Sequence, residues 1–193
     1  MSNDHSEKFA IALVSMPWSI YNRPSIQLGS LKSYLRGQES DLQVDCFHHY
    51  LDIARAIGPQ TYHWLTLSGW AGEALYAPIL FSRMTSEASK LFERERRRFK
   101  RRNTGPDFEF LQRQVETGLR RWAAGINWER YSLVGFSACF NQLLPSLAAA
   151  CLIKEIVPRI NIVFGGSSCG GKGGADLQKN FSQVDFVVRG EGE

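Results

Sequence analysis

The sequence predicts an α/β fold built on a five-stranded parallel sheet with the strand order 2-1-3-4-5. Three observations predict it. Short apolar runs alternate with helical segments, loops containing Gly or Ser follow several of these runs, and one long helix-rich stretch interrupts the alternation. Strands that alternate with helices form parallel sheets with right-handed crossovers, and such sheets bind ligands beyond the carboxyl ends of their strands.

The first two strands and the helix between them come at the start of the chain. Residues 9–15 form a nearly continuous apolar run, which is typical of a strand buried on both faces of a parallel sheet. Ser25 is a suitable cap for a helix over residues 26–36, and Gly37 is expected to end that helix. Residues 42–47 alternate between apolar and polar, which favours a strand nearer the edge of the sheet.

From residue 51 to residue 124 the strand pattern disappears. The segment is rich in aromatic residues, is broken by two Gly-Pro pairs, and shows helical periodicity over residues 87–102 and 108–123. A plain crossover between two parallel strands needs far fewer residues. We therefore expect a helical insertion over residues 51–124, between the second and third strands, within a single domain that covers residues 1–193.

The alternation returns after the insertion. Residues 132–137 predict the third strand, and an apolar, Ala-rich helix over residues 143–157 follows it. Residues 161–165 predict the fourth strand, with a glycine-rich loop and a short helix near residues 175–181 behind it, and residues 184–188 predict the fifth. The arrangement is that of a flavodoxin-like (Rossmann-like) sheet, whose ligands bind at the switch point between the first and third strands.

The bulk composition limits the class of protein. The 193 residues, 44% of them hydrophobic, suffice for one sizeable core. No apolar run is long enough to cross a bilayer, and the polar start of the chain is unlike a secretory signal, so we expect a cytoplasmic protein. The four cysteines stand far apart without a C-x-x-C pair, which argues against a zinc or iron–sulfur site in this chain.

Most of the net charge of +4 lies in residues 93–102, which read E-R-E-R-R-R-F-K-R-R. A basic run can bind nucleic acid or an acidic peptide, but it is more often the solvated face of a helix. No recognisable nucleic-acid module surrounds this run. We therefore predict neither nucleic acid nor a membrane as a partner.

Four predicted strands end in loops that suit a ligand, and three of these loops carry Gly or Ser where the backbone must pass close to something bulky. Together they predict one binding site at the carboxyl edge of the sheet. Its candidate residues are Met16, Pro17 and Trp18 after the first strand, Ser137, Ala138 and Cys139 after the third, Gly165, Gly166 and Ser167 after the fourth, and Gly190 and Glu191 after the fifth.

Nucleotide-binding patterns fit these loops poorly. Residues 166–173 nearly match the phosphate-binding pattern G-x-x-x-x-G-K-[ST], but position 173 is Gly, so the hydroxyl that would bind Mg²⁺ is missing. A dinucleotide fingerprint would place its glycines after the first strand rather than after the fourth. A receiver domain would need acidic residues at the end of the first strand, and none is present at residues 15–18. Nucleotide hydrolysis is therefore the least favoured function.

At these loops the chain resembles the cobalamin (vitamin B12)-binding domains of radical S-adenosylmethionine (SAM) enzymes, in particular those that mature ribosomally made peptide natural products (RiPPs). The resemblance rests on residues 12–18 with 24–29, on 133–137, on 162–168 and on 184–193. The last of these, V-D-F-V-V-R-G-E-G-E, is the most specific. These segments cover both ends of the chain but not the insertion.

Cobalamin domains of the methionine synthase type carry the motifs D-x-H-x-x-G, S-x-L and G-G, and the histidine of the first binds cobalt from below. Residues 15–20 contain neither Asp nor His, so the first motif is absent. Residues 137–139 represent the second motif with Cys in place of Leu, and Gly165-Gly166 represents the third. The resemblance implies that Ser137 and the glycine pair accommodate the nucleotide tail of cobalamin.

The missing histidine implies a cobalt without a protein ligand beneath it, unless His48, His49 or His63 reaches the cobalt from the insertion side. Trp18, in the first loop, could pack against the corrin or belong to ordinary core packing. Cys139 and Cys169 lack a partner base and are interpreted as small apolar residues.

The resemblance implies that this chain binds methylcobalamin within a C-methyltransferase that acts on a peptide substrate. One SAM would supply the methyl group, and a radical from a second SAM would activate the substrate carbon. The C-x-x-x-C-x-x-C motif for a [4Fe–4S] cluster is absent, so SAM and the cluster are expected on a barrel downstream, and no radical reaction is expected from this chain alone.

Two other functions remain open. The chain could be an interaction module with an empty cofactor site, whose basic helix binds an acidic leader peptide or another protein. It could also be a P-loop-like nucleotide binder that depends on Lys172.

Overall fold

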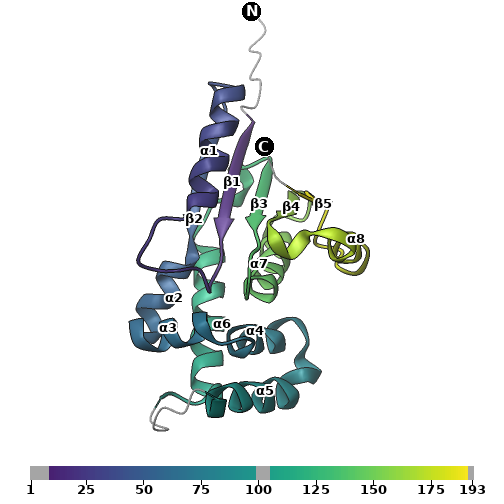
Figure 1. Ribbon diagram of the computed structural model, residues 1–193. Coiled ribbons are helices and arrows are strands. Elements are labelled where there is room, and N and C mark those ends of the chain that lie inside the picture. The colour runs from purple at the N-terminus through teal and green to yellow at the C-terminus, as the bar shows by residue number, and fades with distance from the viewer. Residues whose placement is uncertain (1–8, 99–104, 191–193) are drawn as a thin grey trace, which may run out of the picture.

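A five-stranded parallel sheet with the order β2-β1-β3-β4-β5 organises the chain (Figure 1). Its strands are β1 (Ala10–Ser15), β2 (Gln43–His48), β3 (Leu133–Ser137), β4 (Asn161–Gly165) and β5 (Phe186–Val187). The computed structural model describes residues 9–98 and 105–190. The strand order and the helices between β2 and β3 confirm the predicted fold.

The strands differ in burial as their sequences predict. All six residues of β1 are buried, because β1 pairs with β2 on one side and β3 on the other. In the edge strand β2 only Val44 is fully buried. The strand β5 pairs with β4 through two residues and is shorter than the predicted 184–188.

Eight α-helices occupy the described residues. They are α1 (Ile26–Gln38), α2 (His49–Ile57), α3 (Pro59–Leu67), α4 (Ala71–Leu80), α5 (Thr85–Arg98), α6 (Phe108–Ala124), α7 (Leu143–Ile156) and α8 (Gly171–Asn180). The described connections also contain three short 3₁₀ helices: η1 (Ser82–Met84) between α4 and α5, η2 (Trp128–Arg130) between α6 and β3, and η3 (Ser167–Cys169) between β4 and α8. No helix in the described part of the chain is long and apolar enough to cross a membrane.

Two glycine-based predictions were wrong. Gly37 does not end α1, which continues to Gln38 and is capped by Glu39. The glycine-rich loop after β4 reaches only Gly170, because α8 begins at Gly171. Within α8, a Cβ at Gly174 would collide with the backbone oxygen of Cys169. Glycine at that position therefore serves close packing rather than a loop.

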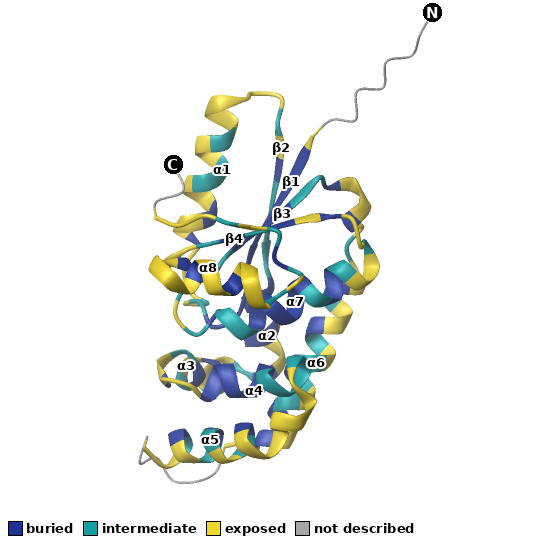
Figure 2. Cartoon of the chain, turned by 90° about the vertical axis from the view of Figure 1, so that its right-hand side faces the viewer, coloured by how far each residue is buried: buried dark blue, intermediate teal, exposed yellow. Residues whose placement is uncertain are grey.

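The two faces of the sheet are covered unequally. One face carries the main core, in which alternate strand residues such as Val14, Phe136 and Phe164 pack against helices that follow β2. The other face carries a small cluster of Ile11, Leu13, Val44 and Leu28, and α1 is the one described helix that contributes to it. Figure 2 shows the same contrast, with buried residues concentrated in the sheet, α2, α4 and α7, and α1 largely exposed.

The helical insertion lies at the carboxyl edge of the sheet. In Figure 1 the arrows of β1 and β3 point toward α2–α6, and α4 packs against α5, α6 and α7. The insertion therefore occupies space next to the strand ends where the sequence predicts a ligand.

Candidate functional site

The loop after β1 is closed off by the insertion. Trp18 is only 3% exposed, and its ring centroid lies 5.2 Å from that of Tyr62 and 6.3 Å from that of Tyr76. A Cβ at Gly72 of α4 would collide with the indole nitrogen, so α4 can approach this closely only because residue 72 is Gly. The structure thus places Trp18 in the core, where its ring faces protein rather than a ligand.

The neighbours of Trp18 are enclosed as well. Met16 and Pro17 are buried, and the side-chain amide of Gln142 donates a hydrogen bond to the backbone oxygen of Met16. The same amide lies 3.5 Å from the hydroxyl of Ser15. These contacts tie the β1 loop to the start of α7. The described conformation therefore does not present Met16, Pro17 or Trp18 to a ligand at the surface.

In the same region, Glu73 of α4 caps the start of α7, the helix that follows β3. Its two carboxylate oxygens accept hydrogen bonds from the backbone N–H groups of Leu143 (2.9 Å) and Leu144 (2.8 Å) at the start of α7. The first N–H groups of a helix lack partners within the helix and favour a negative charge. Burial raises the pKa of Glu73 despite these two hydrogen bonds. Sequence analysis missed this residue, although an acidic residue in an otherwise apolar helix is a usable signal.

An open cleft lies on the other side of the sheet, beside α1. It has a volume of about 450 Å³, and small-molecule sites typically measure about 300–1,000 Å³. Residues from β1, β3 and β4 form its floor, α1 forms one wall, and the β4 and β5 loops form its rim. The lining comprises Ile11, Leu13, Leu133, Gly135, Phe136, Ser137, Val163 and Gly165 from the sheet, Gln27, Leu28, Ser30, Leu31, Tyr34 and Leu35 from α1, and Gly166, Val188 and Gly190 from the rim.

Small residues occupy the carboxyl end of the cleft floor. Gly135 and Ser137 are alternate residues of β3, and Ser137 pairs with Gly165 of β4. A Cβ at Gly165 would find its nearest neighbour, the Cβ of Val188, at an ordinary 3.8 Å. Packing within the described structure therefore does not require glycine at position 165, and the missing side chain leaves open space above the sheet.

The adjacent Gly166 has a different role. Its φ is +97°, and a Cβ there would lie 2.6 Å from the backbone oxygen of Ala138. The β3 and β4 loops are joined at this point, since Ala138 N–H donates to the Gly165 oxygen (2.7 Å) and Ser168 N–H donates to the Ala138 oxygen (3.1 Å). Glycine at position 166 allows the two loops to touch.

The predicted site residues thus fall into separate groups. Ser137, Gly165, Gly166 and Gly190 line the cleft. Ser167 is exposed in η3, Ala138 is buried, and Cys139 is partly buried. Glu191 lies outside the described residues.

The thiol of Cys169 shows no sign of activation. Burial raises the pKa of Cys169 to about 11, with a smaller contribution from Cys139. A thiol with a pKa this high stays neutral near pH 7 and is a poor nucleophile or metal ligand. The described residues contain no group of three or more His, Cys, Asp or Glu that could hold a metal ion.

None of the three candidate histidines lines the cleft. His49 is fully buried, stacks on Trp122 with ring centroids 4.8 Å apart, and contacts Asp52 through Nδ1 at 3.4 Å. His48 packs at the end of β2 against Tyr50 with ring centroids 5.5 Å apart, and His63 is exposed on α3. The described structure therefore offers no histidine beneath a ligand bound at the cleft.

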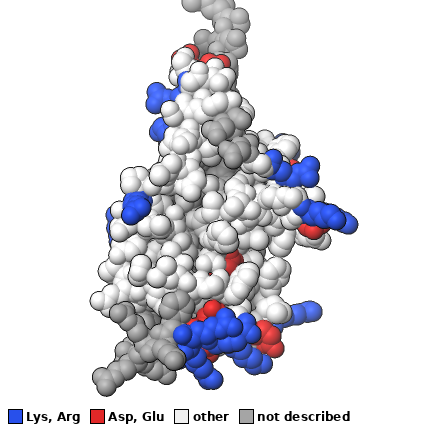
Figure 3. All heavy atoms as spheres, viewed as in Figure 1, with Lys and Arg blue, Asp and Glu red and all other residues white. Residues whose placement is uncertain are grey.

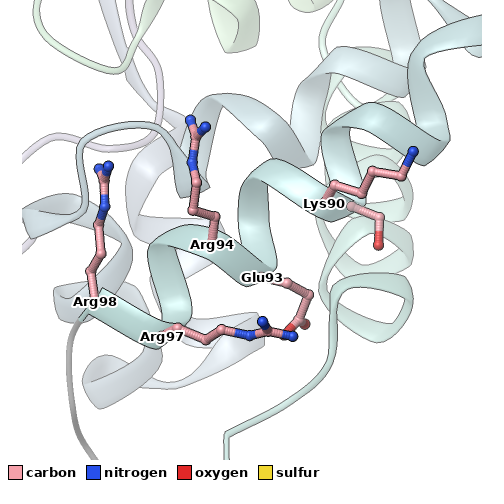
Figure 4. Close-up of a pocket in the computed structure, with 6 residues that line it drawn as sticks. Lys90, Glu93, Arg94, Arg97 and Arg98 are labelled. Atoms are coloured by element: carbon pink, nitrogen blue, oxygen red, sulfur yellow. The ribbon is translucent and has the colours of Figure 1, made fainter.

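A separate basic surface covers α5. Figure 3 shows Lys and Arg gathered over this helix at the end of the molecule far from α1, and Figure 4 shows Arg94, Arg97 and Lys90 projecting from it around a shallow hollow. Acidic residues of the same helix offset part of the charge. Ion pairs join Arg96 to Glu93 (2.7 Å), Arg98 to Glu95 (2.8 Å) and Lys90 to Glu87 (3.4 Å). Such a pattern is typical of a solvated helix face.

Comparison of the chain with protein-family models, curated proteins and solved structures gave no match. The functional argument therefore depends on the residues and geometry of the cleft and its surroundings.

Proposed function

We propose that this chain binds cobalamin, with the nucleotide tail of the cofactor lying in the cleft between α1 and the β3–β4 part of the sheet. One observation carries the proposal. The positions that the cobalamin motifs assign to the tail, Ser137 and the Gly165–Gly166 pair, line a single apolar cleft at the carboxyl ends of β3 and β4.

The chemistry of the cleft suits such a tail. Leu13, Leu31 and Val163 offer apolar contact to a flat heteroaromatic base, and Ser30 of α1 and Ser137 of β3 are polar residues in the same lining. Gly165 lets a ring lie close to the sheet, because a Cβ there would have no neighbour nearer than 3.8 Å. These residues bind and orient the cofactor and take no part in bond breaking.

We further propose that the cofactor serves a radical SAM C-methyltransferase that modifies a ribosomally made peptide. Bound methylcobalamin supplies a transferable methyl group, whereas SAM and the iron–sulfur cluster belong to another domain of that enzyme. The nucleotide-binding alternative has no support from the cleft, because Lys172 lies outside it.

The test is to incubate the purified chain with excess hydroxocobalamin, desalt it and record the visible spectrum of the protein fraction. We expect a retained corrin spectrum, shifted from that of the free cofactor, at about one cofactor per chain. Lys172→Ala, on the exposed start of α8 and outside the cleft, is expected to retain the same amount. A colourless wild-type protein that is folded by circular dichroism would contradict the proposal.

A further inference from the structure

Three large apolar side chains are exposed where the β3–α7 loop meets the α3–α4 loop. The exposed fractions are 87% for Phe140, 58% for Trp70 and 60% for Leu67. The two loops are joined by one hydrogen bond, from the side-chain amide of Asn141 to the backbone oxygen of Ser68 (2.9 Å). Phe140 directly precedes Asn141, Leu67 directly precedes Ser68, and Trp70 follows two residues later. We call these three side chains the edge patch.

The exposure of Phe140 is imposed by a loop that is fixed on both sides. Cys139 N–H donates to the side chain of Gln142 (3.2 Å), and the Gln142 N–H donates back to the Cys139 oxygen (3.0 Å). Asn141 has a φ of +59°, the single non-glycine residue with positive φ in the described chain. Asn adopts this conformation more readily than most residues, and the hydrogen bond to Ser68 holds its side chain in place. The fixed turn therefore presents an aromatic ring to the outside.

The edge patch and the cleft are connected through the loop that follows β3. Phe140 comes three residues after Ser137, so their Cα atoms are at most about 11 Å apart. The hydroxyl of Ser168 donates to the Cys139 oxygen (3.0 Å), which joins the same loop to the segment that follows Gly166. A ligand whose tail fills the cleft and whose body extends past the strand ends would meet the edge patch next.

We propose that the edge patch is the apolar platform for the corrin macrocycle. This inference rests on the proposed function, because it assigns the body of the ligand whose tail occupies the cleft. The corrin is a large ring system with apolar faces, and aromatic side chains gain both burial and stacking by packing on such a surface. Contact with Phe140 and Trp70 would hold the ring where no histidine ligates the cobalt. The insertion supplies Trp70 and, through Ser68, fixes the loop that carries Phe140.

Two ligands separate the platform from the cleft. Hydroxocobalamin has both corrin and tail, whereas diaquocobinamide has the corrin without the nucleotide tail. We expect Phe140→Ala and Trp70→Ala each to raise the dissociation constant of both ligands about 10-fold, as measured by visible absorbance titration. Ser137→Leu, which fills the cleft, should weaken hydroxocobalamin strongly and leave cobinamide unchanged. Phe140→Tyr should bind both ligands like the wild type.

Phe110→Ala is the matched control, because Phe110 is 43% exposed on α6 of the insertion and lies outside both the edge patch and the cleft lining. Wild-type affinity in Phe140→Ala and Trp70→Ala, with Ser137→Leu still blocking hydroxocobalamin, would overturn the platform and leave the proposed function standing. Absence of hydroxocobalamin binding by the wild-type chain would overturn both. Binding of a second copy of the chain or of a peptide at the edge patch, with corrin affinity unaffected by its variants, would also overturn the platform.

Discussion

Gly165 and Gly166 are neighbours that lack side chains for different physical reasons. Gly165 has open cleft above it, and its nearest contact for a Cβ is 3.8 Å away. Gly166 has a φ of +97° and faces the backbone oxygen of Ala138. The G-G motif therefore combines one glycine that keeps space for a ligand with one that lets two loops touch.

This difference predicts opposite responses to one added methyl group. Gly166→Ala should lower the free energy of unfolding by about 3 kcal/mol, since L-residues avoid this backbone region and the new Cβ meets the Ala138 oxygen. Gly165→Ala should change it by less than about 0.5 kcal/mol. Urea denaturation followed by circular dichroism measures both values. Equal destabilisation by the two variants would refute the separate roles.

At the scale of elements, α4 is the helix that joins the insertion to the sheet. Its Gly72 admits Trp18 of the β1 loop, and its Glu73 caps α7. The α4 helix thus fixes the end of β1 and the start of the helix after β3. It also explains why the β1 loop, predicted as ligand-facing, is buried.

Glu73 gives this junction a pH dependence with a defined sign. Its pKa is raised by burial from the ordinary 4.5, so the folded state holds the proton more tightly than the unfolded state does. Its contribution to stability is fully present below pH 4.5 and is lost as pH rises through the folded-state pKa. The free energy of unfolding of the wild type should therefore fall over that range.

In Glu73→Gln this part of the pH dependence should be absent, because the amide does not titrate. Urea denaturation of the wild type and the variant at a series of pH values from 4 upward measures the difference between their slopes. Parallel pH profiles would show that Glu73 titrates in the folded protein as it does in the unfolded chain.

The limits of sequence analysis are also visible at the scale of elements. Residues 26–36, 108–123 and 161–165 were placed to within about two residues, because their apolar period and caps are local signals. Gly37 and the start of α8 were misplaced. Glycine has a low helix propensity, so a helix that begins at Gly171 is hard to predict. The close contacts at Gly174 include the side chains of Val187 and Arg189, more than ten residues away, which no local pattern encodes.

For the whole molecule, the alternation of strands and helices predicted the sheet order. Four of the eleven candidate site residues, Ser137, Gly165, Gly166 and Gly190, line one cleft, and their role as a binding site stays a prediction. The position of the insertion over the carboxyl edge was not predictable. It depends on contacts such as Trp18 with Gly72 and Asn141 with Ser68, between segments more than 50 residues apart. Gly135 makes room for the side chains of Leu13 and Val163, which a Cβ there would meet at 3.1 and 3.5 Å, and this role becomes visible only when β1, β3 and β4 lie side by side.

The central claim, that the α1-side cleft holds the nucleotide tail of cobalamin, is tested most directly by filling the cleft at Gly165. A leucine there would project from the same face of β4 as Val163, which lines the cleft. The measurement is the dissociation constant of hydroxocobalamin, by visible absorbance titration, for the wild type, Gly165→Ala and Gly165→Leu. We predict near wild-type affinity for Gly165→Ala and a loss of about 100-fold or more for Gly165→Leu, equivalent to about 2.7 kcal/mol. Wild-type affinity in a folded Gly165→Leu variant would contradict the account.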